Sequence, residues 1–172
     1  VYQEAIKMGT PITVPITVDG PNGTKITYKV MPRHLNVSGL TVPMTGATAQ
    51  RIADYFKMHL PTAKMSTQIF DAAKLQGNAL VAKPLSGTGI EIDGKHYTGQ
   101  GVVDRGVDST DFALAYNDVV DRQLSSLNAP PGTLTDGPYK TIIQSDKPGH
   151  LGLHGFYDKN GNKKTEKGEQ AI

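Results

Sequence analysis

The stretch TGATAQRIADYFKMHLPTAKMSTQIFDAAKLQG, residues 45–77, predicts two consecutive helices. Good helix formers fill both halves, and Pro61 separates them. In the first half, apolar residues recur at the spacing of one helix face: Ala49, Ile52, Ala53 and Phe56. In the second half, the expected inner face consists of Met65, Ile69 and Phe70. The stretch therefore predicts an αα-hairpin whose two apolar faces pack inward.

The residues at the expected helix ends support the same helix boundaries. Thr45 and Thr62 stand at N-cap positions, where a hydroxyl accepts a hydrogen bond from the first helical turn. Gly77 ends the second helical pattern.

Upstream of these helices, the sequence predicts a β-hairpin. Residues 12–18 alternate apolar and polar, and Pro15 places this strand at an edge because proline lacks an N–H. Residues 19–23 form a turn signal of about five residues. The returning strand, residues 25–31, carries three apolar side chains on one face: Ile26, Tyr28 and Val30.

Downstream, the pattern predicts a small hairpin, a long helix and two further strands. Asp93-Gly94 suits a two-residue turn. The helix runs from Ser109 or Thr110 to about residue 127, with Tyr116 in its apolar stripe, and strands over 139–144 and 151–157 follow. This order indicates an α+β fold with a small antiparallel sheet and three main helices.

The length and composition indicate a globular chain. At 172 residues it suits a single domain, with an N-terminal part over residues 1–77 and a C-terminal part over 78–172. The net charge is +2 and the basic residues are scattered, so we expect no nucleic-acid partner. No apolar run approaches the ~18 residues of a membrane helix, so we expect no transmembrane segment.

The chain contains no cysteine, which excludes disulfides, thiolate zinc sites and a cysteine nucleophile. It opens at Val1 rather than methionine, which suggests a processed or trimmed product. An exported location is slightly favoured on this ground, and the oligomeric state stays open.

Residues 12–127 resemble a family of uncharacterised bacterial proteins. The resemblance is carried by four motifs: KVMP at 29–32, VPMT at 42–45, ATAQRIAD at 47–54 and LPTAKM at 60–65. The family implies no established activity. Its members carry a C-terminal segment with tyrosine and histidine that this sequence lacks.

A second, local resemblance concerns two short segments. Asp108-Ser109-Thr110-Asp111-Phe112 is similar to the helix-starting Asp-Cys-Ser/Thr-x-Phe of papain-like amidases and NlpC-type cell-wall peptidases. Gly149-His150-Leu151-Gly152-Leu153 is similar to their Gly-His-Val-Gly-Ile strand, which carries the catalytic base. The resemblance implies a papain-like fold and cleavage of amide bonds in a peptide or peptidoglycan-like substrate.

The same resemblance assigns roles to individual residues. Ser109 takes the nucleophile position and His150 that of the base, and one of two asparagines, Asn160 or Asn162, orients the imidazole. Three further residues would contact substrate: Asp108, Tyr116 and His154. Serine in place of cysteine is a departure, because a hydroxyl does not form the ion pair with histidine that a thiol forms at a helix N-terminus. An inactivated Cys→Ser form, a non-catalytic scaffold and a chance similarity all stay open.

Plainer interpretations stand beside these. Ser109 with Asp108 is also a helix N-cap. On a strand, His150 and His154 share one face and could bind zinc together with Asp104 or Asp158. The isolated histidines are interpreted as structural or solvated: His34, His59 and His96.

Calcium is a further alternative. Asp158, Asn160, Asn162 and Glu169 have the spacing of an EF-hand loop, but Lys163 occupies the position that requires glycine, and an Asn-Gly hairpin turn explains the segment better. We therefore expect no cofactor, with zinc and calcium as alternatives. The leading hypothesis is a papain-like hydrolase, followed by a non-catalytic binding or structural module and then a zinc-dependent hydrolase.

Overall fold

The structure, a computed structural model, describes residues 1–41, 44–80, 90–92, 94–97, 109–130, 132–155 and 170–171. For residues 90–92, 95–97, 109–113 and 170–171, only the course of the backbone is described. The helices are α1 (Tyr2–Lys7), η1 (Pro21–Gly23), α2 (Gly46–Tyr55), α3 (Ala63–Leu75) and α5 (Ser109–Ser126). The strands are β1 (Val14–Asp19), β2 (Lys25–Val30), β3 (Asn36–Val37), β4 (Leu40–Thr41), β5 (Ile90–Ile92), β6 (Lys95–Tyr97), β7 (Thr141–Gln144), β8 (His150–His154) and β9 (Gln170–Ala171).

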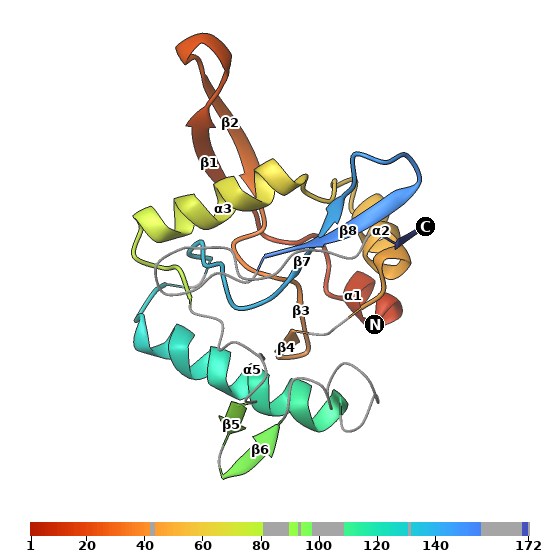
Figure 1. Cartoon of the computed structure of the whole chain (residues 1–172), viewed down its shortest axis with the longest axis vertical. Coiled ribbons are helices and arrows are strands. Elements are labelled where there is room, and N and C mark those ends of the chain that lie inside the picture. The colour runs from red at the N-terminus through yellow and green to blue at the C-terminus, as the bar shows by residue number, and fades with distance from the viewer. Residues whose placement is uncertain are drawn as a thin grey trace.

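These elements confirm the α+β class. The described strands form four small antiparallel sheets rather than one: β1-β2, β3-β4, β5-β6 and β7-β8-β9. Each hairpin pairs within itself, because helices and loops separate it from the next in the chain (Figure 1). None of the described helices combines the length and the hydropathy needed to cross a bilayer.

The two predicted helices are present as α2 and α3, but they do not pack together as an αα-hairpin. Ile52 of α2 packs with α1 and β3, whereas Ala73 of α3 packs with the β1-β2 hairpin (Figure 1). Thr45 Oγ1 accepts a hydrogen bond from Thr48 N at 3.3 Å, and Thr62 Oγ1 accepts one from Met65 N at 3.2 Å. The inner face of α2 is as expected, with Ala49, Ile52 and Ala53 buried. Both threonines therefore cap their helices as the sequence indicated.

The inner face of α3 differs by one position from the prediction. The buried residues are Ser66, Phe70 and Ala73, whereas Met65 and Ile69 are only half-buried. Ala73 packs in one cluster with Ile16, Val30 and Leu134. The small side chain of Ala73 allows α3 to pack closely against the base of the β1-β2 hairpin.

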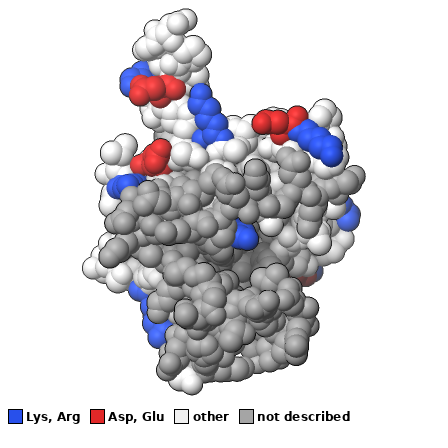
Figure 2. All heavy atoms as spheres, in the orientation of Figure 1, with Lys and Arg blue, Asp and Glu red and all other residues white. Residues whose placement is uncertain are grey.

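The β1-β2 hairpin projects beyond α3 (Figure 1). Its register runs from Val14↔Val30 to Asp19↔Lys25, which confirms the five-residue loop. Val30 is buried at the base, but Ile26 is 45% exposed near the loop. The face of β2 that was expected to be apolar is therefore buried only at the base of the hairpin, and it is exposed near the loop. Figure 2 shows acidic and basic side chains interspersed on this projection, where Lys25 Nζ pairs with Asp19.

Residues 134–144, here called the central segment, connect the two halves of the chain. Thr135 N donates to Pro32 O at 2.7 Å, Leu80 N donates to Asp136 O at 2.7 Å, and Gln144 N donates to Pro61 O at 2.9 Å. The central segment ends in β7, which pairs with β8 in the register Thr141↔His154. It therefore touches the first hairpin, the end of α3 and the turn between α2 and α3.

At Gly137, the backbone of the central segment lies very close to the backbone of Leu80. The φ of Gly137 is +118°, and a Cβ built there would lie 2.2 Å from Leu80 O. Only glycine fits both the backbone conformation and the space.

The described residues form three clusters of buried hydrophobic side chains. The α5 cluster contains Leu80, Tyr116, Val119 and Val120, and places the predicted stripe of that helix inward. A second cluster contains Ile16, Val30, Ala73 and Leu134. The third contains Ala5, Val37 and Ile52 and joins α1 to α2.

Candidate functional site

The predicted nucleophile lies at the first residue of a helix. α5 begins at Ser109, but the side chain of Ser109 falls outside the described part of the structure. Asp108, Asn160 and Asn162 also lie outside the described residues, as do Asp104 and Asp158. The set of Ser109, His150 and an asparagine therefore stays a prediction.

His150 begins β8 and is half-buried. Its Nδ1 lies 3.0 Å from the carbonyl oxygen of Pro148, a pairing in which the imidazole donates. In the neutral ring, Nε2 is then the acceptor. In Figure 1, β8 lies beside β7, whereas α5 lies beside the β5-β6 hairpin and β4.

His154, predicted to contact substrate, is a core residue. It is buried, and its Nδ1 lies 3.1 Å from Ser66 Oγ on α3. The structure thus does contain a serine–histidine pair between a helix and a strand, but both partners are enclosed. Among the described residues, no three of histidine, aspartate and glutamate come together in a group that could hold a metal ion.

Tyr116, the other predicted substrate contact, packs in the α5 cluster. It is buried, and its hydroxyl donates to Pro138 O at 2.6 Å. Burial raises its pKa, and the nearby Tyr139 adds to the shift. This hydrogen bond links α5 to the central segment.

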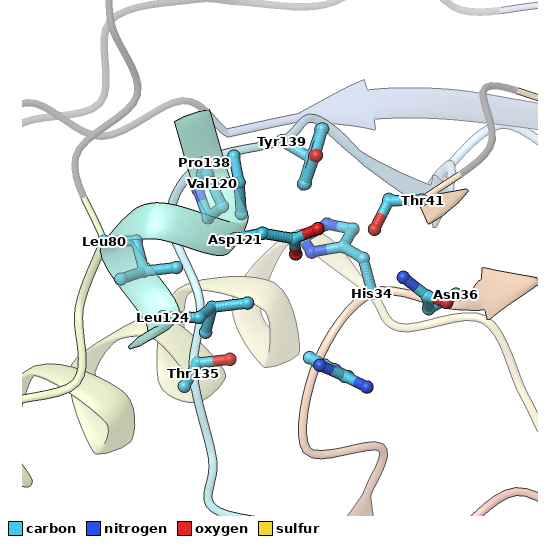
Figure 3. A pocket seen from close by; sticks show the side chains of 11 residues that line it. His34, Asn36, Thr41, Leu80, Val120, Asp121, Leu124, Thr135, Pro138 and Tyr139 are labelled. Carbon is cyan, nitrogen blue, oxygen red and sulfur yellow. The ribbon is translucent and has the colours of Figure 1, made fainter. Parts of the chain in front are cut away.

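A small hollow of about 20 Å³, room for roughly one water molecule, lies between the Arg33–Thr41 region, α5 and the central segment (Figure 3). We call it the His34 pocket. Its lining residues are Arg33, His34, Asn36, Thr41, Leu80, Val120, Asp121, Leu124, Thr135, Pro138 and Tyr139. None of these residues was singled out by sequence as a site residue, and His34 was interpreted as structural or solvated.

His34 is held by groups from the central segment. Its Nε2 lies 3.1 Å from Thr141 Oγ1, and its Nδ1 lies 3.8 Å from Asp136 Oδ1. The imidazole is 21% exposed. Burial lowers its pKa, which the charge of Asp136 opposes, so the ring is neutral at pH 7.

Asp136 is buried beneath His34. Burial raises the pKa of its carboxyl group, and both His34 and the Gly137 N–H, which donates to Oδ1 at 2.8 Å, oppose the shift. The order of hydroxyl, imidazole and carboxyl resembles that of a hydrolase triad. However, Thr141 is not among the described residues that line the pocket. These contacts fix the wall of the pocket and do not present a nucleophile to it.

Tyr139 contributes a hydroxyl group to the wall. Its ring contacts His34 and Tyr116 edge-on, at centroid separations of 5.5 and 5.4 Å. Burial raises its pKa to about 12; Thr41 opposes the shift and Asp121 adds to it. The hydroxyl oxygen is buried, and no group in the described part of the chain reaches it in good hydrogen-bond geometry.

Asp121 and Asn117 form the α5 side of the pocket. Asn117 Nδ2 donates to Asp121 Oδ2 at 2.8 Å, and Asn117 Oδ1 accepts from Thr41 N at 3.0 Å. Figure 3 shows the Asp121 carboxylate and the Thr41 hydroxyl directed toward His34. One buried amide therefore orients both a pocket carboxylate and the strand that carries Thr41.

Comparisons with protein-family models, with curated proteins and with solved structures found no match. The function of the His34 pocket is therefore inferred from its own geometry.

Proposed function

We propose that the protein binds a small polar ligand in the His34 pocket. The observation that carries the proposal is the Tyr139 hydroxyl, which is buried and has no partner in good hydrogen-bond geometry among the described residues; its interaction with the Thr41 side chain does not meet that geometry. Buried polar groups are almost always paired, because an unpaired one costs about 1–3 kcal/mol. A ligand that reaches this hydroxyl removes that cost.

The pocket wall is suited to binding because it is fixed in advance. His34 is held by Thr141 and Asp136, and Asp121 is held by Asn117. Polar side chains that are already oriented lose little conformational entropy when a ligand arrives. Leu80, Val120 and Leu124 add an apolar surface beside these polar groups.

The test is a titration with small polar compounds followed by NMR of the backbone amides. We expect the shifts to concentrate on residues of the His34 pocket and the affinity to fall in Tyr139→Phe. Tyr55→Phe is the matched control, because Tyr55 is exposed and does not line the pocket. Binding that is unchanged in Tyr139→Phe, or shifts centred elsewhere, would contradict the proposal.

The papain-like hydrolase is a second candidate. Two observations support it: α5 begins at Ser109, and the hydrogen bond from His150 Nδ1 to Pro148 O leaves Nε2 as the acceptor that a general base requires. The substrate would be an amide bond in a peptide or in peptidoglycan.

A gain-of-function variant tests this second candidate. Ser109→Cys restores the nucleophile of the motif, so we expect turnover of peptidoglycan fragments that disappears in Ser109→Cys/His150→Ala. Absence of turnover by a folded Ser109→Cys protein would contradict the hydrolase candidate. Ligand binding would then be the remaining proposed function.

A further inference from the structure

The loop that joins β1 to β2, at the far end of the projecting hairpin, contains the pair Asn22-Gly23 (Figure 1). Both residues are exposed and have positive φ, 55° and 74°. A Cβ built on Gly23 would meet nothing within 4 Å, so the surroundings of this peptide bond are open. In the described part of the chain, no group forms a hydrogen bond with the Asn22 side chain. Its amide group is therefore accessible to water and to its own backbone.

An asparagine side chain can react with the backbone nitrogen of the residue that follows it. The nitrogen of Gly23 forms a bond to Cγ of Asn22, the bond from Cγ to Nδ2 breaks, and ammonia leaves with the proton of the Gly23 N–H. Water then opens the resulting succinimide at either carbonyl group and yields aspartate or isoaspartate. The ring closure is intramolecular, the only co-reactant is water, and glycine hinders the attack least because it has no Cβ.

The other described asparagines lack at least one of these features. Asn36 and Asn78 are half-buried and Asn117 is buried, and a residue with a Cβ follows each of them. Asn128 is the nearest counterpart of the loop asparagine, because it is exposed and has a φ of 49°. However, Ala129 follows it.

The closed loop does not hold the reacting atoms together. The ψ of Asn22 is 34°, which places the Gly23 nitrogen nearly opposite Cβ across the Cα–C bond, so the loop must open before the ring can close. Two hydrogen bonds to Pro21 O keep the loop closed, from Thr24 N at 3.1 Å and from Thr24 Oγ1 at 2.7 Å. Loss of either bond favours the open loop.

We propose that Asn22 is a site of spontaneous deamidation, at a rate set by the opening of the β1-β2 loop. The reaction places a negative charge in a loop that is flanked by the Asp19–Lys25 ion pair, and it lowers the net charge of +2 by one. An isoaspartate also inserts the side-chain carbon into the backbone and so lengthens the loop. The inference is independent of the proposed binding function, because no loop residue lines the His34 pocket.

The experiment incubates the intact protein at pH 8 and follows individual tryptic peptides by mass spectrometry. Trypsin releases residues 8–25, in which Asn22 is the only amide side chain. It separates this peptide from Asn128 and from the Asn-Gly pair at 160–161, which lies outside the described residues. We expect conversion of amide to acid at least about tenfold faster at Asn22 than at Asn128, a difference in barrier of about 1.4 kcal/mol.

Two variants test the chemistry and the loop separately. Gly23→Ala should slow the reaction at least about tenfold, because the new Cβ hinders ring closure. Thr24→Ala should speed it by about two- to tenfold, because one hydrogen bond that closes the loop is lost. Thr10→Ala, at an exposed position outside the hairpin, is the matched control and should change nothing. If Asn22 reacts no faster than Asn128, or equally fast in Gly23→Ala, the assignment of the site is wrong. An unchanged rate in Thr24→Ala would overturn the role of the loop.

Discussion

His34 Nε2 lies 3.1 Å from Thr141 Oγ1, although 107 positions separate the two residues in the chain. Together with the Asp136 carboxyl group at 3.8 Å from Nδ1, this contact joins the segment after β2 to the segment that leads into β7. The pocket depends on it, because both segments supply lining residues. Changes that weaken this junction should therefore affect stability and binding together.

The stability supplied by His34 should decrease in acid. Its folded-state pKa is lowered, so its contribution is fully present above the unfolded value of about 6.5 and is lost as the pH falls through the folded value. We expect the advantage of the wild type over His34→Gln in free energy of unfolding to shrink between pH 7.5 and pH 5. Urea denaturation at each pH measures it, and His59→Gln, at an exposed position, is the control. An advantage that grows in acid would contradict this assignment.

The contribution of Asp136 to the free energy of unfolding should depend on pH in the opposite direction. Its folded-state pKa is raised, so its contribution is present below the unfolded value of about 3.9 and is lost as the pH rises through the folded value. Asp136→Asn mimics the protonated group. We expect this variant to gain stability relative to the wild type as the pH rises from 4 to 7. A difference that is constant over this range would mean that burial does not perturb Asp136.

Substitution of Gly137 should be far more costly than substitution of a glycine with only a positive φ. In Gly137→Ala the new Cβ meets Leu80 O, and the backbone is also strained, so we expect a loss of about 2–5 kcal/mol. Gly132→Ala has the same kind of backbone strain but no atom within 4 Å, and should lose about 1–2 kcal/mol. Chemical denaturation of both variants checks this; equal losses would show that Leu80 can move aside.

Asn117 should be important for stability although it is polar. Asn117→Ala removes the acceptor of Thr41 N and the donor to Asp121, and we expect a loss of about 1–3 kcal/mol. Asp118→Ala, at the exposed neighbouring position, should stay within about 0.5 kcal/mol of the wild type. Because Asn117 also orients Asp121, its loss should weaken ligand binding; unchanged binding would show that Asp121 needs no support.

Phe70 and Leu75 lie on the same helix and differ strongly in burial. Phe70 is 2% exposed, and Phe70→Ala should lose about 3–5 kcal/mol. Leu75 is 90% exposed, and Leu75→Ala should stay within about 0.5 kcal/mol. Thermal unfolding of both variants measures the difference. Similar losses would indicate that Leu75 is covered, for instance by a second molecule.

Elements that depend on nearby residues could be predicted from the sequence. The caps at Thr45 and Thr62 and the loop between β1 and β2 are fixed within a few positions, so the residue pattern contains the necessary information. The prediction of the inner face of α3 was less accurate. Ser66 is a poor candidate for a core position, but in the folded protein His154, 88 positions later, supplies a partner for its hydroxyl.

The His34 pocket could not be predicted for the same reason. His34 follows a strand, Asp121 lies on the polar side of a helix, and Tyr139 follows an Asp-Gly-Pro turn. No spacing rule relates these three positions, because their proximity results from how the central segment crosses the molecule. A motif search finds residues that act as neighbours in the chain, as with Ser109 and its flanking residues.

The contacts of the central segment have a consequence for the order of folding. Its partners Pro32, Pro61 and Leu80 all precede it by more than fifty positions. While the ribosome makes the chain, Pro32 and Leu80 gain these partners only when residues 135 and 136 have emerged, and Pro61 gains its partner only at residue 144. The pocket is incomplete until residue 139 has emerged. Helices α2 and α3 and the β1-β2 hairpin can form early from local contacts. Closure around residues 134–144 should therefore be the slow step of folding, and the step that chaperones would have to protect.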